Sequence, residues 1–325
     1  MVYLAAGVPL KNPTILAAGI LGTTGASMSR VIQNGAGGVV TKSIGPVPVY
    51  GHANPSMITL AANGGKGQVY GYLNAMGLPN PSFDEFRQEI EFVKSKDDGN
   101  INGQKKEKIE QKKEHAPVIA SIFGGDAADF VAVAEGLAPS MPDAFELNLS
   151  CPHAKGYGAD IGSQPCHVEE ITAAVKNAVD VPVWVKLTPN VANIKDIGLA
   201  AQAGGADAVV AINTVRGMAI DIHSGWPVLG NRAGGMSGPA VKPVAVKCVY
   251  DLHEALEIPV IGVGGISCWE DMVEMMMAGA SAVQIGSAVY ENDMIFDDLW
   301  TGVQLFMKEN GFAFDELIGM AHRRK

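Results

Sequence analysis

The stretch PVWVKLTPNVANIKDIGLAAQAGGADAVVAIN, residues 182–213, decides the fold class of this chain. It opens with a short apolar run rich in β-branched residues, Pro182–Leu187, and it closes with a second such run, Ala208–Asn213. Between them, Ile194–Ala203 has its apolar residues at helical spacing. A buried strand, a helix and a second buried strand form one β/α unit, in which the two strands pair in parallel.

The same alternation recurs on both sides of this unit. The predicted strands are Thr14–Ala18, Gly38–Lys42, Pro117–Phe123, Ala144–Ser150, Pro182–Leu187, Ala208–Asn213, Pro259–Val263 and Ala282–Gly286. The predicted helices are Phe83–Lys94, Ala127–Leu137, Val168–Ala178, Ile194–Ala203, Pro243–Leu256 and Ser267–Met277. Most strand runs are continuously apolar, as in parallel strands that are buried on both faces. Eight such units predict an α/β fold, a closed (β/α)8 TIM barrel, with a doubly wound open sheet as the alternative.

Two stretches depart from the alternation. Residues 97–115 (DDGNINGQKKEKIEQKKEH) are polar and rich in lysine, which predicts a solvated surface insertion, with partner docking as the alternative. Residues Met218–Gly238 are rich in glycine and are predicted to form a hairpin insertion. Long loops after barrel strands usually shape the active site. We therefore expect residues 1–325 to form one barrel domain with active-site loop insertions.

Composition excludes several classes of protein. With 47% hydrophobic residues among 325, the chain can bury a full core and is not disordered. Four cysteines without a CxxC pair argue against a disulfide-stapled domain, a zinc site or an iron–sulfur cluster, so no metal site is predicted. A formal charge of −10 argues against general nucleic-acid binding. We find neither a signal peptide nor a membrane-spanning run, and expect a cytoplasmic protein.

Polar residues follow several predicted strands at the end where barrel enzymes carry their catalytic groups. Lys42, Asn148, Lys186 and the pair Asn213–Thr214 stand at or near four such strand ends. Any one of them is compatible with a surface or capping role. Because four strands end in such groups, we expect them to converge on one site.

Cys151 stands out among the cysteines. It lies in a Ser-Cys-Pro turn directly after a predicted strand and close to the candidate lysines, whereas Cys248 falls inside a predicted helix. A thiol in such surroundings can have a lowered pKa and act as a base or a nucleophile.

Two glycine clusters end the last two predicted strands, Gly262–Gly265 and Gly286–Ser287. In barrels the loops after these strands often bind phosphate, because glycine lets backbone N–H groups approach the anion. A phosphorylated ligand is predicted, such as FMN or a sugar phosphate.

Taken together, these segments resemble the dihydroorotate dehydrogenases, most of all the type 1B catalytic subunit of class 1. The resemblance runs through nearly the whole chain and rests on the segments Lys11–Pro13, Ala17–Gly19, Thr41–Ser43, Asn74–Asn80, Asn148–Pro152, Val185–Asn190, Ile212–Thr214, Gly234–Pro239, Gly262–Gly265 and Ile285–Ser287. It implies an FMN-bearing barrel that oxidises (S)-dihydroorotate to orotate in the biosynthesis of pyrimidines.

The resemblance also implies roles for individual residues. Cys151 would be the general base, and Lys42 would contact both flavin and substrate. The implied substrate contacts are Lys42, Asn74, Ala75, Met76, Gly77, Leu78, Asn148, Asn213 and Thr214. The implied FMN contacts are Ala18, Lys42, Ser43, Ser121, Asn148, Lys186, Ile212, Gly238, Gly264, Gly265, Gly286 and Ser287. It further implies a homodimer core, or a heterotetramer with a partner subunit that carries FAD and a [2Fe–2S] cluster and passes electrons to NAD⁺.

Two positions depart from the family pattern. His153 replaces an asparagine after Ser-Cys-Pro, as in the related dihydropyrimidine dehydrogenases, and Ser121 replaces an asparagine expected to face the flavin. The alternatives are therefore a barrel subunit that reduces uracil or thymine, and a phosphate-binding barrel without redox chemistry.

Overall fold

The structure is a computed structural model that describes residues 3–97, 116–149 and 161–323. Its centre is a closed barrel of parallel strands in the order β3-β4-β7-β8-β9-β10-β13-β14, which confirms the predicted TIM barrel and excludes the open sheet. The barrel strands are β3 (Thr14–Leu16), β4 (Gly38–Val40), β7 (Val118–Ile122), β8 (Ala144–Asn148), β9 (Val183–Leu187), β10 (Ala208–Ala211), β13 (Val260–Val263) and β14 (Ala280–Ile285).

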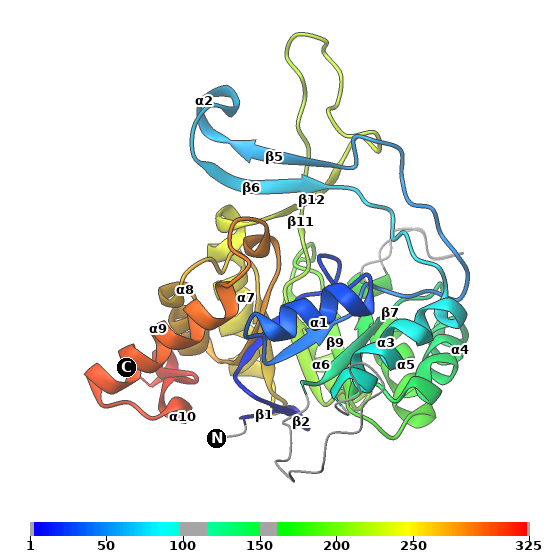
Figure 1. Cartoon of the computed structure of the whole chain (residues 1–325), viewed down its shortest axis with the longest axis vertical. Helices are drawn as coiled ribbons and strands as arrows, with labels where there is room; N and C mark the ends of the chain where they lie inside the picture. The colour runs from blue at the N-terminus through cyan, green and yellow to red at the C-terminus, as the bar shows by residue number, and fades with distance from the viewer. Residues whose placement is uncertain (1–2, 98–115, 150–160, 324–325) are drawn as a thin grey trace, which may run out of the picture.

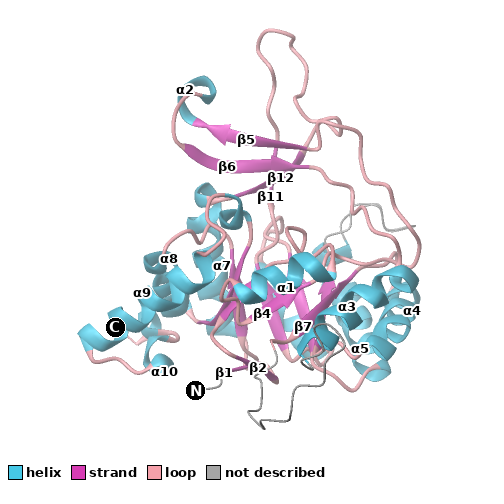
Figure 2. Cartoon of the chain, viewed as in Figure 1, coloured by secondary structure: helices cyan, strands magenta, loops and turns pink. Residues whose placement is uncertain are grey.

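Helices surround the barrel (Figures 1 and 2). They are α1 (Gly25–Gln33), α3 (Phe83–Asp97), α4 (Ala127–Leu137), α5 (Pro165–Ala178), α6 (Ile194–Ala203), α7 (Lys242–Ala255), α8 (Trp269–Ala278) and α9 (Ile295–Asn310), with short turns α2 (Ala62–Gly65) and α10 (Phe314–Leu317). All the predicted helices are present, and α4 and α6 have the predicted ends. The prediction missed α1 and α9, although the buried Ile295, Leu299 and Val303 of α9 recur at helical spacing.

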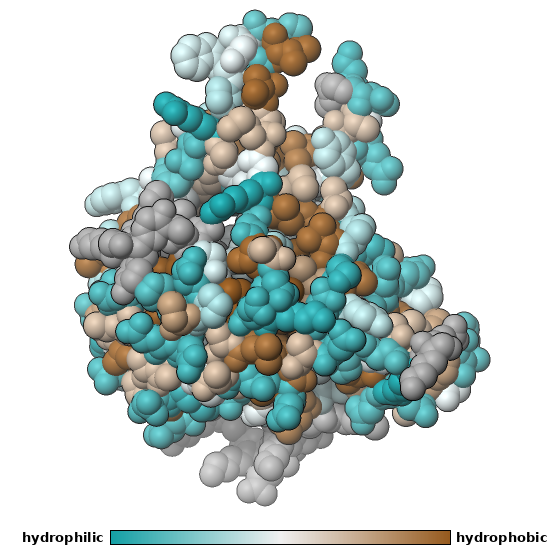
Figure 3. Space-filling view, turned by 180° about the vertical axis from the view of Figure 1, so that it is seen from behind, coloured by the Kyte–Doolittle hydropathy of each residue, from teal (hydrophilic) through white to brown (hydrophobic). Residues whose placement is uncertain are grey.

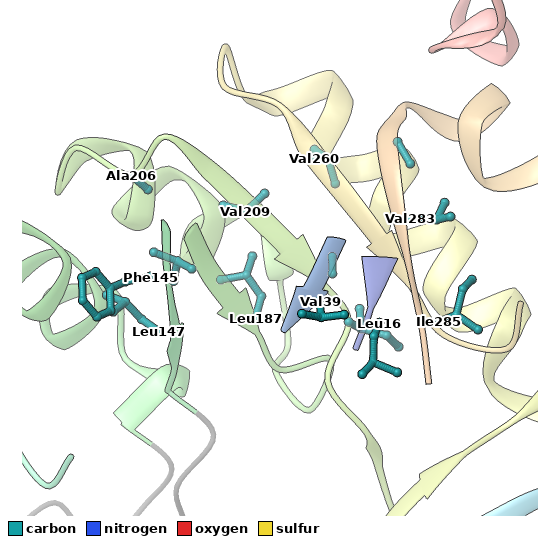
Figure 4. Close-up of a cluster of buried hydrophobic side chains, with 14 of the residues drawn as sticks. Leu16, Val39, Phe145, Leu147, Leu187, Ala206, Val209, Val260, Val283 and Ile285 are labelled. Atoms are coloured by element: carbon teal, nitrogen blue, oxygen red, sulfur yellow. The ribbon is translucent and has the colours of Figure 1, made fainter. Parts of the chain in front are cut away.

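Strand alternation separates two cores. On β9, Val183, Val185 and Leu187 point outward into the layer between barrel and helices, where Figure 4 shows Leu187 among similar side chains. Trp184 points inward and is fully buried in the barrel interior. Replacing such a side chain by alanine typically costs about 3–5 kcal/mol.

One end of the barrel is closed by an N-terminal hairpin of β1 (Tyr3–Ala5) and β2 (Val8–Leu10) (Figure 1). Ala5, Val8 and Leu10 join the interior core, and Trp184 Nε1 donates a hydrogen bond to the Ala6 carbonyl at 3.4 Å. The hairpin plugs the amino-terminal ends of the strands, so access to the interior is from the carboxyl ends.

Over the carboxyl ends lies a second sheet, here called the capping sheet, with all its pairs antiparallel (Figure 2). Its order is β11 (Val215–Gly217), β12 (Gly234–Ser237), β6 (Val69–Asn74) and β5 (Met57–Ala61). A hairpin is present as β11 and β12, but only β12 lies within the predicted residues 218–238, because β11 ends at Gly217 and the intervening residues form the loop. The pairing with β6 required long-range contacts that the sequence did not indicate.

The capping sheet and the loop between β11 and β12 project from the barrel and expose several hydrophobic side chains (Figure 3). Met218, Ile220, Ile222 and Trp226, on the loop between β11 and β12, are all more than half exposed. Among the helices that the structure describes, none is long and apolar enough to span a bilayer.

Candidate active site

A pocket of about 560 Å³ lies between the carboxyl ends of the barrel strands and the capping sheet. This volume is in the usual range of small-molecule sites. Strand ends supply Lys42, Asn148 and Lys186 to its lining, and the capping sheet supplies Asn74 and Met236. Residues from distant parts of the sequence meet here because parallel strands all end on the same side of the barrel.

Polar side chains on one side of the pocket form a chain of hydrogen bonds. Asn213 Nδ2 donates to Asn148 Oδ1 at 3.2 Å, and Asn148 Nδ2 donates to Ser43 Oγ at 3.0 Å. Ser43 Oγ also lies 3.0 Å from the hydroxyl of Ser121, which is fully buried. The backbone N–H of Thr214 donates to Asn213 Oδ1 at 2.8 Å. These contacts fix the orientation of both asparagine amides before a ligand arrives.

Lys42 presents a nearly buried cation to the pocket. The residue is 7% exposed, and burial lowers the pKa of its ammonium group. Within the described residues, no hydrogen bond or ion pair to its Nζ is found. A buried cation without a protein partner favours an anionic ligand, which would supply the missing compensation.

The deepest polar group of the pocket comprises Lys186, Gln284 and Glu146, here called the floor cluster. Lys186 and Gln284 line the pocket, whereas Glu146 lies below them and is fully buried. Lys186 Nζ donates to Gln284 Oε1 at 3.1 Å, and Gln284 Nε2 donates to Glu146 Oε2 at 2.5 Å. The second carboxylate oxygen, Glu146 Oε1, lies 3.5 Å from Lys186 Nζ.

Glycines after β13 and β14 form a cradle on another side of the pocket. Gly264 and Gly265 have φ values of +136° and +74°, which other residues rarely adopt. An added Cβ at Gly286 would meet no atom closer than Ala17 Cβ at 3.9 Å, so Gly286 faces open space. In the described chain, the N–H groups of Gly264, Gly265 and Gly286 donate to no backbone acceptor. Such unpaired N–H groups are suited to bind a phosphate.

The capping sheet is tied to the barrel next to this cradle. Tyr72 Oη, on β6, donates to Glu291 Oε1 at 2.5 Å, just after the short helix η4 (Ser287–Tyr290). Burial, together with the bond to this carboxylate, raises the pKa of Tyr72 to about 12. The Tyr72 hydroxyl therefore stays protonated at ordinary pH, and its bond to Glu291 holds the capping sheet over the pocket.

The structure brings nearly all the candidate site residues together. The pocket is lined by Ala18, Lys42, Ser43, Asn74, Ala75, Met76, Gly77, Leu78, Asn148, Lys186, Ile212, Asn213, Thr214, Gly238, Gly264, Gly265, Gly286 and Ser287. Ser121 lies one layer behind, against Ser43. Cys151, His153 and nearly all of the lysine-rich stretch lie outside the described residues.

Sequence reasoning missed several residues that line the pocket or lie directly beneath it. Gln284 and Glu146 interrupt the apolar runs SAVQI and AFELN, and a polar residue inside a buried strand was an available signal. No comparable sequence signal marked Asn190 as a pocket residue. Its Nδ2 donates to Thr188 Oγ1 and to the Thr214 carbonyl, each at 3.0 Å, and thereby supports the pocket wall that includes Thr214.

Comparison with known proteins finds relatives that match nearly the whole length of this chain. Residues 3–307 match the family model described as dihydroorotate dehydrogenase. The chain is 63% identical over 324 residues to the dihydroorotate dehydrogenase B (NAD(+)) catalytic subunit of Methanosarcina mazei, covering 99% of this chain and 95% of the relative. It is 48% identical over 317 residues to the protein of the same name from Pyrococcus abyssi, covering 97% of each chain.

Proposed function

The chain belongs to the dihydroorotate dehydrogenase family, and we propose that it is the catalytic subunit that oxidises (S)-dihydroorotate to orotate in pyrimidine biosynthesis. The observation that carries this proposal is the 63% sequence identity over 324 residues to the catalytic subunit from Methanosarcina mazei. Membership of this family argues against a barrel without redox chemistry and favours dihydroorotate over uracil or thymine as the substrate.

We place the substrate against Lys42 and the asparagines of the pocket. Dihydroorotate carries a carboxylate and an imide, which need a cation and paired donors and acceptors. The Lys42 ammonium supplies the cation, while Asn74, Asn148 and Asn213 supply amides with both donor and acceptor atoms. The substrate contacts that the family resemblance implies for residues 75–78 and for Thr214 complete this proposed substrate site.

The cofactor in this proposal is FMN, which would supply the acceptor for the hydride from C6 of the substrate. Three features of the pocket fit it. The glycines 264, 265 and 286, with Ser287, would hold the phosphate. Lys186 would sit beside the pyrimidine edge of the ring, where a cation stabilises the negative charge of reduced flavin. Ala18, Ser43, Ile212 and Gly238 would line the remainder, with Ser121 supporting Ser43 from behind.

Cys151 is the proposed general base. Cys151 comes three residues after Asn148 in the sequence, and Asn148 ends β8 and lines the pocket, which supports this role. Its thiolate would take the C5 proton while C6 gives up the hydride. Lys42 is the second proposed catalytic residue, because its charge orients the substrate carboxylate and compensates developing negative charge.

A partner subunit follows from the relatives' name, which describes a catalytic subunit and NAD(+). We propose that the partner carries FAD and a [2Fe–2S] cluster, and that the assembly is a heterotetramer around a homodimer of this chain. The described residues contain no group of three or more side chains suited to bind a metal ion.

The decisive experiment is the anaerobic visible spectrum of the purified chain before and after addition of dihydroorotate. The expected result is a yellow protein that releases FMN on denaturation and whose flavin band bleaches with dihydroorotate. Bleaching with dihydrouracil alone would replace the substrate by that of the dihydropyrimidine dehydrogenases. A colourless protein that takes up no FMN would overturn the proposal.

A further inference from the structure

The floor cluster contains a buried carboxylate that the proposed reaction does not use. Glu146 is fully buried and does not line the pocket, and its Oε1 accepts no hydrogen bond within the described residues. A buried charge is costly unless it compensates another charge, and Lys186 Nζ lies 3.5 Å from that oxygen. The charge that Glu146 compensates is therefore that of the Lys186 ammonium.

Gln284 links the two charges in one orientation only. Its amide oxygen accepts from Lys186, and its amide nitrogen donates to Glu146. A flipped amide would place its oxygen against the carboxylate and its NH₂ group against the ammonium, and both contacts would be repulsive. The amide thus bridges the carboxylate and the ammonium, which also lie 3.5 Å apart at Glu146 Oε1 and Lys186 Nζ.

We propose that Glu146, acting through Gln284, is a positioning residue that holds the Lys186 ammonium at the pocket floor and partly offsets its positive charge. This proposal rests on the proposed function, because the group that senses the cluster is the bound flavin. A cation near the flavin favours electron uptake, and a carboxylate behind that cation moderates the effect. The cluster would thereby tune how readily the bound cofactor takes a hydride.

Two variants separate charge from position. Glu146→Gln removes the negative charge but leaves an amide oxygen that can accept from Gln284. Gln284→Met removes the link and leaves both charges, so Lys186 is free to turn toward Glu146 and away from the pocket. The first change makes the floor more positive, whereas the second makes it less positive.

The probe is sulfite, which adds to electron-poor flavins and bleaches their absorbance independently of turnover. In the FMN-loaded protein we expect Glu146→Gln to bind sulfite more tightly, by on the order of tenfold. We expect Gln284→Met to bind it more weakly, by several-fold. The matched control is Glu254→Gln, which removes the same charge from an exposed pair with Lys195 and should bind sulfite as the wild type does.

Sulfite affinities that are unchanged, or that shift in the same direction in both variants, would overturn the proposal, since merely loosened packing has no reason to give opposite signs. If Glu146→Gln does not fold, Gln284→Met decides alone, and unweakened sulfite binding would reject the positioning role. A wild-type protein without flavin would instead refute the proposed function. Normal bleaching by dihydroorotate with wild-type sulfite binding in both variants would refute only this inference.

Discussion

Asn213 and Asn148 are hydrogen-bonded to each other on one side of the pocket, with Nδ2 of Asn213 donating to Oδ1 of Asn148 at 3.2 Å. Asn148 ends β8 and Asn213 follows β10, so the bond spans the end of β9, which lies between these strands. Both ends of each amide have a protein partner, since Asn148 also donates to Ser43 and Asn213 also accepts from the Thr214 N–H, so each amide has a defined direction. Ligand recognition then requires little reorganisation of these side chains.

Changing Asn213 to Asp should disrupt this arrangement without altering its shape. An ionised carboxylate cannot donate to Asn148 Oδ1, and its charge would repel the anionic product. We expect orotate affinity in the FMN-loaded protein to fall by about ten- to a hundredfold, as for a lost hydrogen bond with a buried unpaired group. The measurement is the perturbation of the flavin spectrum on titration with orotate.

The matched control for this substitution is Asn34→Asp on the surface, where the Asn34 side chain donates to the Asp293 carbonyl. It introduces the same charge at a residue that does not line the pocket and should leave orotate affinity unchanged. Equal losses in the two variants would show that net charge, and not the bond to Asn148, causes the effect.

Lys42 predicts a pH dependence of anion binding. Burial holds its pKa below the ordinary lysine value of 10.5, so in the free site Lys42 is charged below that lowered pKa and neutral above it. Affinity for orotate should be full at low pH and fall as the pH rises through this pKa, by about tenfold per pH unit.

The comparison variant for the pH profile is Lys42→Met, which should bind orotate weakly and lose this dependence. Flavin-difference titrations at several pH values test both expectations. An unchanged wild-type affinity up to the ordinary lysine pKa would contradict the assignment of Lys42 as the anion partner.

Gly286→Ala tests the proposed phosphate cradle. The new methyl group meets only Ala17 Cβ at 3.9 Å within the protein, so thermal stability without FMN should be unchanged. The methyl would occupy space next to the phosphate, and FMN affinity should fall by roughly tenfold, the usual effect of one misplaced methylene-sized group. Fluorescence titration of the apoprotein with FMN measures this affinity.

Gly264→Ala provides the contrast. Its Cβ would lie 2.8 Å from Ala245 Cβ at a φ of +136°, so this variant should lose thermal stability as well as FMN affinity. If Gly286→Ala retained full FMN affinity, the phosphate would have to be placed elsewhere.

Cys151→Ala should retain FMN and lose flavin reduction by dihydroorotate by about two to four orders of magnitude, the usual contribution of a general base. Cys151→Ser should lose less, because a hydroxyl can still accept a proton when it is activated. Anaerobic stopped-flow absorbance measures the rate. Cys166→Ala, at an exposed cysteine on α5, is the control and should reduce its flavin at the normal rate. Loss of FMN from Cys151→Ala would mean that the residue supports the cofactor site.

The sequence by itself determined the barrel, because continuous apolar runs separated by amphipathic helices leave few other ways to bury both faces of each strand. It also indicated which end carries the chemistry, since Lys42, Asn148 and Asn213 stand at strand ends. Only the tertiary structure decided which residues cover the pocket and which lie beneath it. The capping sheet depends on the pairing of β6 with β12, which are far apart in the chain and have no local signal for each other. The floor depends on the inward direction of Glu146, Lys186 and Gln284, which become hydrogen-bonding neighbours only when the barrel closes.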